Sequence, residues 1–398
     1  MKTLAFITIT FSLLISTSTA AEKPGGAFGL RIVSDSAPDW SSRENFVKSA
    51  LSAWETDQEK CLAQFWWSYH GRRVGPYAHE DGRPVMDPIL FFNSYGLTFC
   101  SMISSMNVSL WEAAGYEGRV VNVTGHVISE VKYDGAWHMF DNDFSNYFYR
   151  EDGTIASAKY LHENRVRKPG EYFVFEHCPM LSSPKGRIFM GPSSWKIEGV
   201  AKDWYKDYRP RLNCTCAQAG NRYILGVRPD EVYTRYFHPI GYGKDFSRPI
   251  KDRDAAAEGG STLRNSRANG RWVWKPDLSD NSVLFHSENL KSTPRGIEPA
   301  DPKKPGTAVF HVMAANVATS ARIVCKAQQS NRRPIRFAVS RTHGVHWTPV
   351  NARHGRKGLL AIAVQEAVAG KQGYLLKATP PPGSRMENIR FETVTQVN

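Results

Sequence analysis

One cysteine, one histidine and two aspartates between residues 95 and 143 have the types and spacing that nucleophilic catalysis by a thiolate needs. Cys100 precedes a run from Ile103 to Ala114 in which apolar residues recur at helical spacing, and Gly115 follows where a helix end favours a left-handed residue. We therefore expect Cys100 in the first turn of a helix. Unpaired backbone N–H groups and the helix dipole stabilise a thiolate there, and the same N–H groups can bind an oxyanion.

A predicted β-hairpin carries the histidine and the aspartates. His126 begins a run rich in β-branched residues, Asp134-Gly135 is a strong two-residue hairpin signal, and the return strand leads to Asp141 and Asp143. If this loop sets the register, His126 lies opposite Asp143 and diagonal to Asp141, and both carboxylates share its face. Either aspartate is then near enough to orient an imidazole that acts as general base. Taken singly these residues are ordinary, and it is their joint order that favours catalysis.

The segment resembles the core of transglutaminase-like proteins, in which a cysteine opens a helix and a later strand has the form H-x-x-x-E-V-x-x-x-G-x-W-H-x-x-D. The matching residues of this chain are Cys100, Gly115 to Val120, His126, Glu130-Val131, Gly135, Trp137-His138 and Asp141. Two pairs depart from the family pattern. Val127-Ile128 replaces Ala-Trp after the histidine, and Asn142-Asp143 replaces Pro-Thr after the aspartate.

The resemblance implies an α+β fold with a papain-like transglutaminase core, in which a helix bearing Cys100 packs on an antiparallel sheet bearing His126 and Asp141. It makes Cys100 the nucleophile, His126 the base and Asp141 the residue that orients it, with Asp143 as the alternative orienter. The expected reaction is attack on an amide carbonyl through a thioester that water or an amine releases. Hydrolysis is favoured over crosslinking, because no calcium site or amine-donor channel is recognisable in the sequence. We predict no metal and no cofactor.

Upstream of the cysteine, residues 41–69 predict a helix, because apolar residues recur there at a rough helical spacing. The family resemblance implies that this helix packs beneath the catalytic one. Its aromatic cluster, Phe65 to Trp67, is interpreted as core, with a wall of a glycan groove as the alternative. Asn93 or Tyr95 is predicted to donate to the oxyanion or to contact substrate.

The first twenty residues are typical of a secretory signal peptide. A basic start at Lys2 leads into an apolar run from Leu4 to Ile15 that is too short to span a bilayer, and small residues end it near Ala20. No later stretch is long and apolar enough for a membrane helix. We therefore predict a secreted or periplasmic protein with no membrane span.

Charge and composition narrow the partners. The 398 residues carry a formal charge of +13 with 41% hydrophobic residues, which is ample for packed cores. The basic residues are scattered without a Lys/Arg block, so no nucleic acid is expected. We predict an extracellular peptide or glycan substrate. The basic excess favours an anionic substrate, and a solvated basic surface with no specific partner is the equal alternative.

Composition also divides the mature chain. Residues 251–260 have linker composition, so we predict a transglutaminase-like catalytic domain with extensions over 22–255 and an all-β sandwich over 261–398. An ordered piece from Val232 to Phe237 is expected to pack back on the catalytic core. Beyond the linker, short alternating runs separated by Gly, Pro and Asn predict antiparallel strands. They are Thr307 to Met313, Ser320 to Lys326, Ile335 to Ser340, Leu359 to Gln365, Gly373 to Ala378 and Asn388 to Val394.

The segments 339–347 and 374–377 resemble galactose-binding-like jelly-roll modules, which implies carbohydrate binding. His346 and Trp347 are candidates for a sugar-stacking platform, although a buried strand tryptophan is the favoured interpretation.

Six cysteines leave five once the proposed nucleophile is set aside, so at least one more is free or pairs outside the chain. Cys325, in a strand-like run, is predicted to be buried. The pairing among Cys61, Cys178, Cys214 and Cys216 stays open. A zinc site of His177-Cys178 with Cys214 and Cys216 is a less favoured alternative, because its spacing fits no familiar zinc module.

Two other function classes remain beside the cysteine enzyme. A non-catalytic protein on the same scaffold would bind an extracellular glycan or cell wall. A carbohydrate-active enzyme of the polysaccharide-lyase type would use His126 with a nearby tyrosine, and Cys100 would be dispensable to it.

Overall fold

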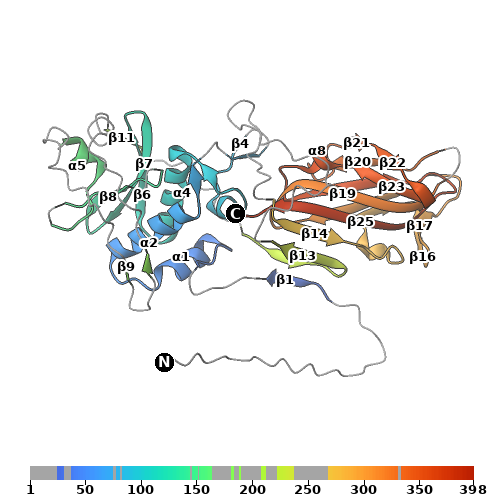
Figure 1. The fold of residues 1–398 in the computed structure, drawn as a ribbon, viewed down its shortest axis with the longest axis horizontal. Coiled ribbons are helices and arrows are strands. Elements are labelled where there is room, and N and C mark those ends of the chain that lie inside the picture. The colour runs from blue at the N-terminus through green and yellow to red at the C-terminus, as the bar shows by residue number, and fades with distance from the viewer. Residues whose placement is uncertain are drawn as a thin grey trace, which may run out of the picture.

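The computed structural model describes residues 25–30, 37–74, 78–80, 83–143, 146–150, 152–163, 181–182, 188–189, 208–211, 222–236, 268–329 and 333–398. Two parts lie end to end along the longest axis (Figure 1). The first combines helices with a four-stranded antiparallel sheet, and the second is built from strands. The fold is thus mixed, with a β-rich part. The predicted signal peptide, the predicted linker and the alternative zinc residues lie outside the described residues.

The predicted helix over residues 41–69 is two helices. These are α1 (Arg43–Leu51) and α2 (Asp57–His70). The break arises because Thr56 and Glu59 form a capping box, in which each side chain accepts a hydrogen bond from the other's backbone N–H, and this starts a new helix.

The cysteine helix and its sheet follow the predicted local pattern. Helix α4 (Cys100–Ala113) ends before Gly115, which has φ of +90°, and it packs on strands β6 (Glu117–Val123) and β7 (His126–Tyr133). Strands β8 (Ala136–Phe140) and β11 (Tyr208–Arg211) complete the antiparallel sheet in the order β11-β6-β7-β8.

The hairpin of β7 and β8 has the predicted loop but a shorter ladder than predicted. Tyr133 pairs with Ala136, and the pairing ends at Ser129 with Phe140. Asp141 leaves the ladder and forms an isolated antiparallel bridge with Asn146. The prediction that His126 lies directly opposite Asp143 in the sheet is therefore wrong, because the chain turns away after Phe140.

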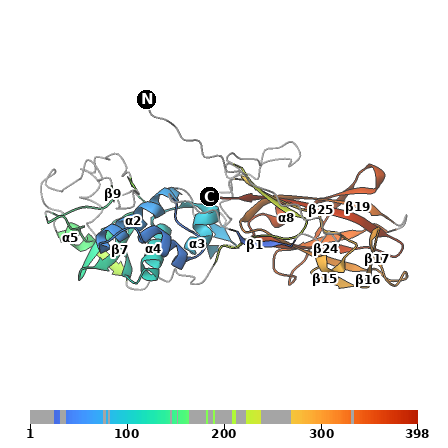
Figure 2. The ribbon, with the colours of Figure 1, turned by 90° about the horizontal axis from the view of Figure 1, so that it is seen from below.

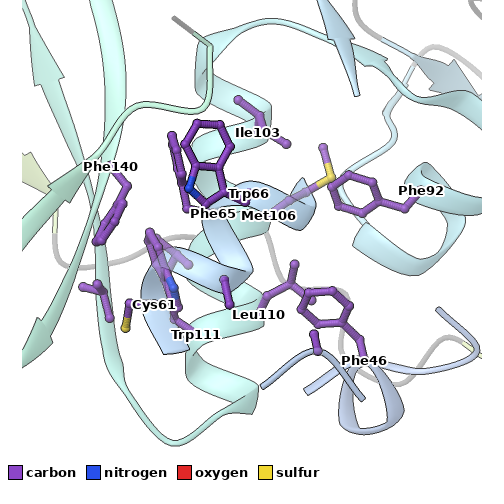
Figure 3. Close-up of a cluster of buried hydrophobic side chains, with 14 of the residues drawn as sticks. Phe46, Cys61, Phe65, Trp66, Phe92, Ile103, Met106, Leu110, Trp111 and Phe140 are labelled. Carbon is purple, nitrogen blue, oxygen red and sulfur yellow. The ribbon is translucent and has the colours of Figure 1, made fainter. Parts of the chain in front are cut away.

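A dense apolar core fixes the helices against this sheet. Figure 3 shows aromatic and aliphatic side chains of α2 and α4 meeting those of the sheet. Phe65 and Trp66 are fully buried, which confirms their interpretation as core. Phe65 lies against Phe140 at a ring-centroid distance of 5.5 Å, and Phe140 lies 5.4 Å from Trp111 of α4. The core thus holds the end of β8 close to the cysteine helix.

The β-rich part consists of two antiparallel sheets that enclose a second core. One sheet has the order β13-β14-β25-β19-β23-β22, with β16 and β17 attached through β25. The other has the order β15-β18-β24-β20-β21. Across the two sheets, six strands overlap the six predicted runs: β18 (Thr307–Met313), β19 (Val317–Gln328), β20 (Arg336–Ser340), β23 (Leu359–Ala363), β24 (Gly373–Thr379) and β25 (Arg385–Gln396).

Two expectations about this part are wrong. Strand β13 (Glu231–Arg235) pairs with β14 (Gly270–Trp274), so the piece expected on the catalytic core belongs to the sandwich sheet instead. In the chain, β13 lies before residue 261, the predicted start of the sandwich. Trp347 lies in the loop after β20 rather than in a strand, it is half-buried, and the Lys377 Nζ lies 4.2 Å from its ring centroid.

Side-chain amides of the β-rich part donate hydrogen bonds to backbone carbonyls of the helical part where the two parts meet. Gln396 donates to the carbonyl of Ser94, Asn316 donates to that of Asn93, and Asn398 donates to that of Gly71. In both Figure 1 and Figure 2 the C-terminus accordingly lies at the junction of the two parts.

The remaining elements are short. They are β1 (Ala27–Leu30), β2 (Arg73–Val74), β3 (His79–Glu80), β4 (Arg83–Pro84), α3 (Pro88–Leu90), a π-helical turn (Phe91–Tyr95), β5 (Leu97–Thr98), α5 (Ala158–Glu163), β9 (Leu181–Ser182), β10 (Ile188–Phe189), β12 (Leu225–Val227), 3₁₀ turns at Asn281–Val283 and Arg356–Gly358, β15 (His286–Glu288), β16 (Leu290–Thr293), β17 (Gly296–Pro299), β21 (Thr348–Val350), β22 (Ala352–His354) and α8 (Gln365–Val368). Among the described helices, none has the length and apolar character to cross a membrane.

Candidate active site

Cys100 is the first residue of helix α4, as the sequence predicts. Phe99 before it has an extended backbone and provides no side-chain cap, so the first N–H groups of the helix are not capped by that side chain. Cys100 is partly exposed, unlike the other described cysteines. Its thiol therefore combines access with the positive end of a helix dipole, the environment in which a thiolate is stabilised.

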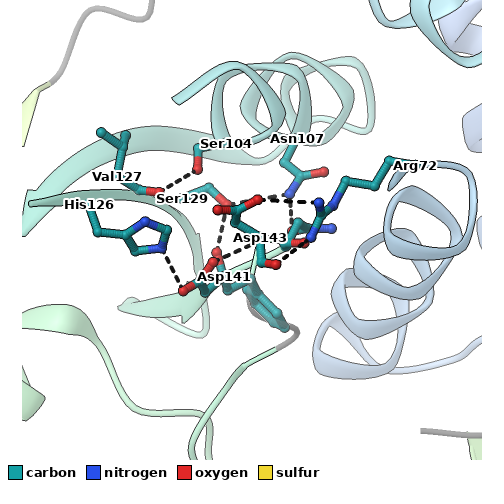
Figure 4. A network of polar contacts seen from close by, with 10 residues as sticks. Arg72, Ser104, Asn107, His126, Val127, Ser129, Asp141 and Asp143 are labelled. Atoms are coloured by element: carbon teal, nitrogen blue, oxygen red, sulfur yellow. Dashed lines mark hydrogen bonds and ion pairs between the residues drawn. The ribbon is translucent and has the colours of Figure 1, made fainter. Parts of the chain in front are cut away.

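The histidine and the first aspartate form the expected pair. His126 Nε2 lies 2.8 Å from Asp141 Oδ2, and both side chains are buried (Figure 4). Ligand atoms of Cys100, His126 and Asp143 all lie within 4.8 Å of one another. Because Asp141 occupies Nε2, the other ring nitrogen, Nδ1, is the one that can exchange a proton with the thiol. The structure thus brings all three predicted triad residues together.

Asp143, the alternative orienter, has a different partner. Its Oδ1 lies 3.2 Å from Arg72 Nη1, and the Arg72 side chain is only 1% exposed. The backbone N–H of Asp143 donates to Asp141 Oδ1 at 2.9 Å. The contact with the imidazole therefore belongs to Asp141, while Asp143 pairs with an arginine and braces the turn.

Three residues that the sequence analysis did not predict as site residues hold this turn. Arg72 donates to the backbone carbonyls of Asn142 and Asp143, and the Asn142 side chain bonds Asn107 of helix α4. Asn142 Nδ2 also donates to the carbonyl of Phe65 in α2. The turn that carries Asp141 is thereby tied to both helices, including the one that carries Cys100. A weaker signal was present, because Asn107 is a polar residue on the apolar face of a predicted helix.

Electrostatics at the site favour a protonated imidazole. Burial disfavours the charged ring, but hydrogen bonds and Coulombic attraction from Asp141 and Cys100 outweigh it and raise the pKa of His126 to about 10. Burial lowers the pKa of Arg72, and the charges of the Asp143 and Asp141 carboxylates oppose this decrease. An imidazolium beside a thiol is the arrangement that stabilises the thiolate as an ion pair.

The raised pKa of His126 predicts a direct spectroscopic result. The protonated ring is the stabilised form, so its NMR resonances should not titrate from pH 5 to pH 8.5 and should move as pH approaches 10. In Asp141→Asn the titration should shift down towards the ordinary histidine value of about 6.5. His70, whose pKa is lowered by burial, serves as the internal control. A His126 midpoint near 6.5 in the unsubstituted protein would contradict this assignment.

The two residues predicted to donate to an oxyanion are placed differently. Asn93 Nδ2 donates to the carbonyls of Trp40 and Ile89, both at 2.8 Å, so both N–H donors of its amide are committed to the backbone and the prediction that Asn93 donates to the oxyanion is wrong. Tyr95 is fully buried in the core. The N–H groups at the start of α4 remain the candidate oxyanion donors.

The other described cysteines contrast with Cys100. Cys61 and Cys325 are free and completely buried, so the first takes no part in a disulfide and the second is buried as predicted. Burial raises the pKa of both thiols, that of Cys325 to about 12. Cys178, Cys214 and Cys216 lie outside the described residues.

Two cavities lie elsewhere in the described structure. One, of about 440 Å³, is lined by residues such as Glu44 and Arg222, and the other, of about 320 Å³, is lined by Trp40, Tyr233 and Arg235 among others. Neither is lined by Cys100 or His126.

Neither a protein-family model nor a curated protein matches the sequence. Among solved structures, the chain is similar to one described as carbohydrate-binding modules from the β-sandwich superfamily with promiscuous specificity, at 8% identity and a TM-score of 0.14. That match covers 42% of this chain and 53% of the other, so it spans about half of the matched structure. A TM-score this low does not establish a shared fold.

Proposed function

We propose that this chain is a transglutaminase-like cysteine enzyme with a papain-like core that acts on an amide bond through a thioester. One observation carries the proposal: a buried His126–Asp141 pair at 2.8 Å, with the partly exposed Cys100 at a helix N-terminus beside the imidazole. Residues that only pack in a core need neither this order nor this exposure. The combination is the geometry by which a nucleophile, its base and an orienting carboxylate are recognised.

The proposed reaction has two stages, formation of a thioester and its hydrolysis, and both stages use the same residues. The Cys100 thiolate attacks the amide carbonyl carbon, and N–H groups at the start of α4 stabilise the oxyanion. His126 donates its proton to the departing nitrogen as the C–N bond breaks, which leaves a thioester. His126 then takes one proton from water as the water oxygen attacks the thioester, and the C–S bond breaks to release the thiolate and a carboxylic acid, which loses its proton to solvent. Asp141 keeps the ring oriented throughout.

Hydrolysis, as by a protease or amidase, is proposed over crosslinking because the sequence has no recognisable calcium site or amine-donor channel. We propose an extracellular peptide or glycan-linked amide as substrate, with anionic character to match a basic chain. Secretion after removal of a signal peptide is part of the same proposal. Carbohydrate binding by the β-rich part stays a prediction.

Selective alkylation tests the proposal without a known substrate. Native protein treated with iodoacetamide at pH 6 should be modified at Cys100 and spared at Cys61 and Cys325, which are buried controls in the same molecule. At this pH an ordinary thiol with a pKa of about 8.5 is almost wholly protonated and reacts slowly. Mass spectrometry of the digested protein locates the label, and an amide-substrate screen with Cys100→Ala as the blank follows.

An inert Cys100 in native protein would overturn the thiolate mechanism. Cleavage of an acidic polysaccharide by Cys100→Ala at the unsubstituted rate would favour the lyase alternative instead.

A further inference from the structure

We propose that Cys100, His126 and Asp143 form a binding site for Zn²⁺, with the metal covering the thiol. Metal binding does not depend on the proposed function, whereas its consequence, reversible inhibition of the enzyme, rests on it. The three residues come from the start of α4, the start of β7 and the turn after β8. The fold therefore brings them together from three separate segments.

The donor set and its spacing fit zinc. A thiolate sulfur, an imidazole nitrogen and a carboxylate oxygen are the ligand types that Zn²⁺ takes, and all three atoms lie within 4.8 Å of one another. Ligand atoms around a tetrahedral zinc are about 3.3–3.6 Å apart, given bonds of about 2.0–2.3 Å. A side-chain adjustment of about 1 Å would close the site. Soft sulfur with imidazole favours zinc over Mg²⁺ or Ca²⁺, which select oxygen ligands.

The partners of these ligands match what a zinc site needs. A zinc-bound histidine donates its other ring N–H to a carboxylate in most sites, and His126 Nε2 already lies 2.8 Å from Asp141 Oδ2. Nδ1 is then the ring nitrogen that would bind the metal. Arg72 bonds Asp143 Oδ1 at 3.2 Å and both neighbouring carbonyls, which fixes the third ligand in position. Three protein ligands leave the fourth position of the metal to water.

A competition titration tests the site. The mature protein is titrated with ZnCl₂ in the presence of a chromophoric zinc chelator, and each variant is compared with Cys61→Ala, which removes a buried thiol that is not one of the proposed ligands. One equivalent of zinc should bind to the unsubstituted protein and to Cys61→Ala. Affinity should fall more than 100-fold in Cys100→Ala and by about 10- to 100-fold in Asp141→Asn, which loses only the partner of the histidine ligand.

A second measurement needs no variant. One equivalent of Zn²⁺ should slow alkylation of Cys100 by iodoacetamide at least tenfold, and excess EDTA should restore the rate. Zinc that binds equally well to Cys100→Ala, or that is lost in Cys178→Ala or Cys214→Ala instead, would overturn the proposal in favour of the other cysteines. Zinc protection of Cys100 in a protein that cleaves no amide would sustain this inference while the proposed function fails.

Discussion

Asparagine in place of Asp141 should slow alkylation of Cys100 at pH 6 by about 10- to 100-fold. Asp141 is the residue that holds the imidazolium, since its hydrogen bond and charge, together with those of Cys100, outweigh burial and raise the pKa of His126 to about 10. Without the Asp141 carboxylate the pKa of His126 falls towards about 6.5, so the ring is partly neutral at pH 6, and it also loses the hydrogen bond that holds it beside the thiol. A thiol of ordinary pKa is only about 0.3% ionised at pH 6, and the greater intrinsic nucleophilicity of its thiolate offsets part of that deficit.

The same substitution should cost more in catalysis than in alkylation. Once a cleaved amide is known, we expect kcat to fall by about 10³- to 10⁴-fold, because asparagine holds the ring in the wrong tautomer for both proton transfers. The measurement is a comparison of kcat and of the alkylation rate across pH 5 to 10. His126→Ala should match the decrease in both, since the two residues act as one unit.

Asp143→Asn is the matched control for this prediction. The two aspartates are separated by one residue, but only Asp141 contacts the imidazole in the structure. The alkylation rate in Asp143→Asn should therefore stay within about threefold of the unsubstituted rate. If Asp143→Asn abolished the low-pH reactivity while Asp141→Asn kept it, the assignment of the orienting residue would have to be reversed.

The parts of this site that the sequence predicted are those that local signals determine. Helical spacing and Gly115 located the cysteine helix, and the Asp134-Gly135 loop located the hairpin with its pairing up to Phe140. The turn from Asp141 to Asp143 escaped prediction because distant partners decide it. Arg72 lies 71 residues before Asp143 in the chain, and spacing within the hairpin carries no information about it.

The β-rich part has the same division. Alternation of apolar residues found its strands, because each strand shows one face to a core. It could not place Glu231 to Arg235, whose partner strand begins at Gly270, because pairing is a long-range property. The sequence also showed no sign that Gln396 and Asn316 donate hydrogen bonds to the carbonyls of Ser94 and Asn93 at the junction of the two parts. A side-chain amide at a junction and one exposed to solvent are the same residue type, and the sequence pattern does not distinguish them.

The arginine that holds the turn should also contribute strongly to the stability of the helical part. Arg72→Met removes the partner of a buried carboxylate, since the side chains of Arg72 and Asp143 are 1% and 8% exposed. Breaking a buried pair by removing one partner costs about 3–5 kcal/mol of unfolding free energy, because an uncompensated charge is left behind. Urea denaturation followed by circular dichroism at pH 7.5 measures the decrease.

Lys132→Met is the control for the removal of a charge as such. The Lys132–Glu117 pair joins neighbouring strands at 3.2 Å, but its side chains are 41% and 58% exposed. Water already solvates both groups, so this substitution should cost less than about 1 kcal/mol. Equal decreases in the two variants would show that Arg72 contributes no more than a surface charge.

The pH dependence distinguishes the charge of Arg72 from its packing in the Arg72→Met variant. Burial already raises the pKa of Asp143, and Arg72 is the group that opposes this shift. Without Arg72 the pKa of Asp143 in the folded state rises further above its unfolded value of about 3.9. Protonated Asp143 is tolerated in the folded protein at low pH, and stability is lost as pH rises through this raised folded-state pKa and the buried carboxyl ionises. The deficit of Arg72→Met should thus be smaller at pH 4.5 than at pH 7.5. A deficit that is the same at both would attribute it to the packing of the arginine side chain, and the turn that carries Asp141 would then depend on shape rather than on charge.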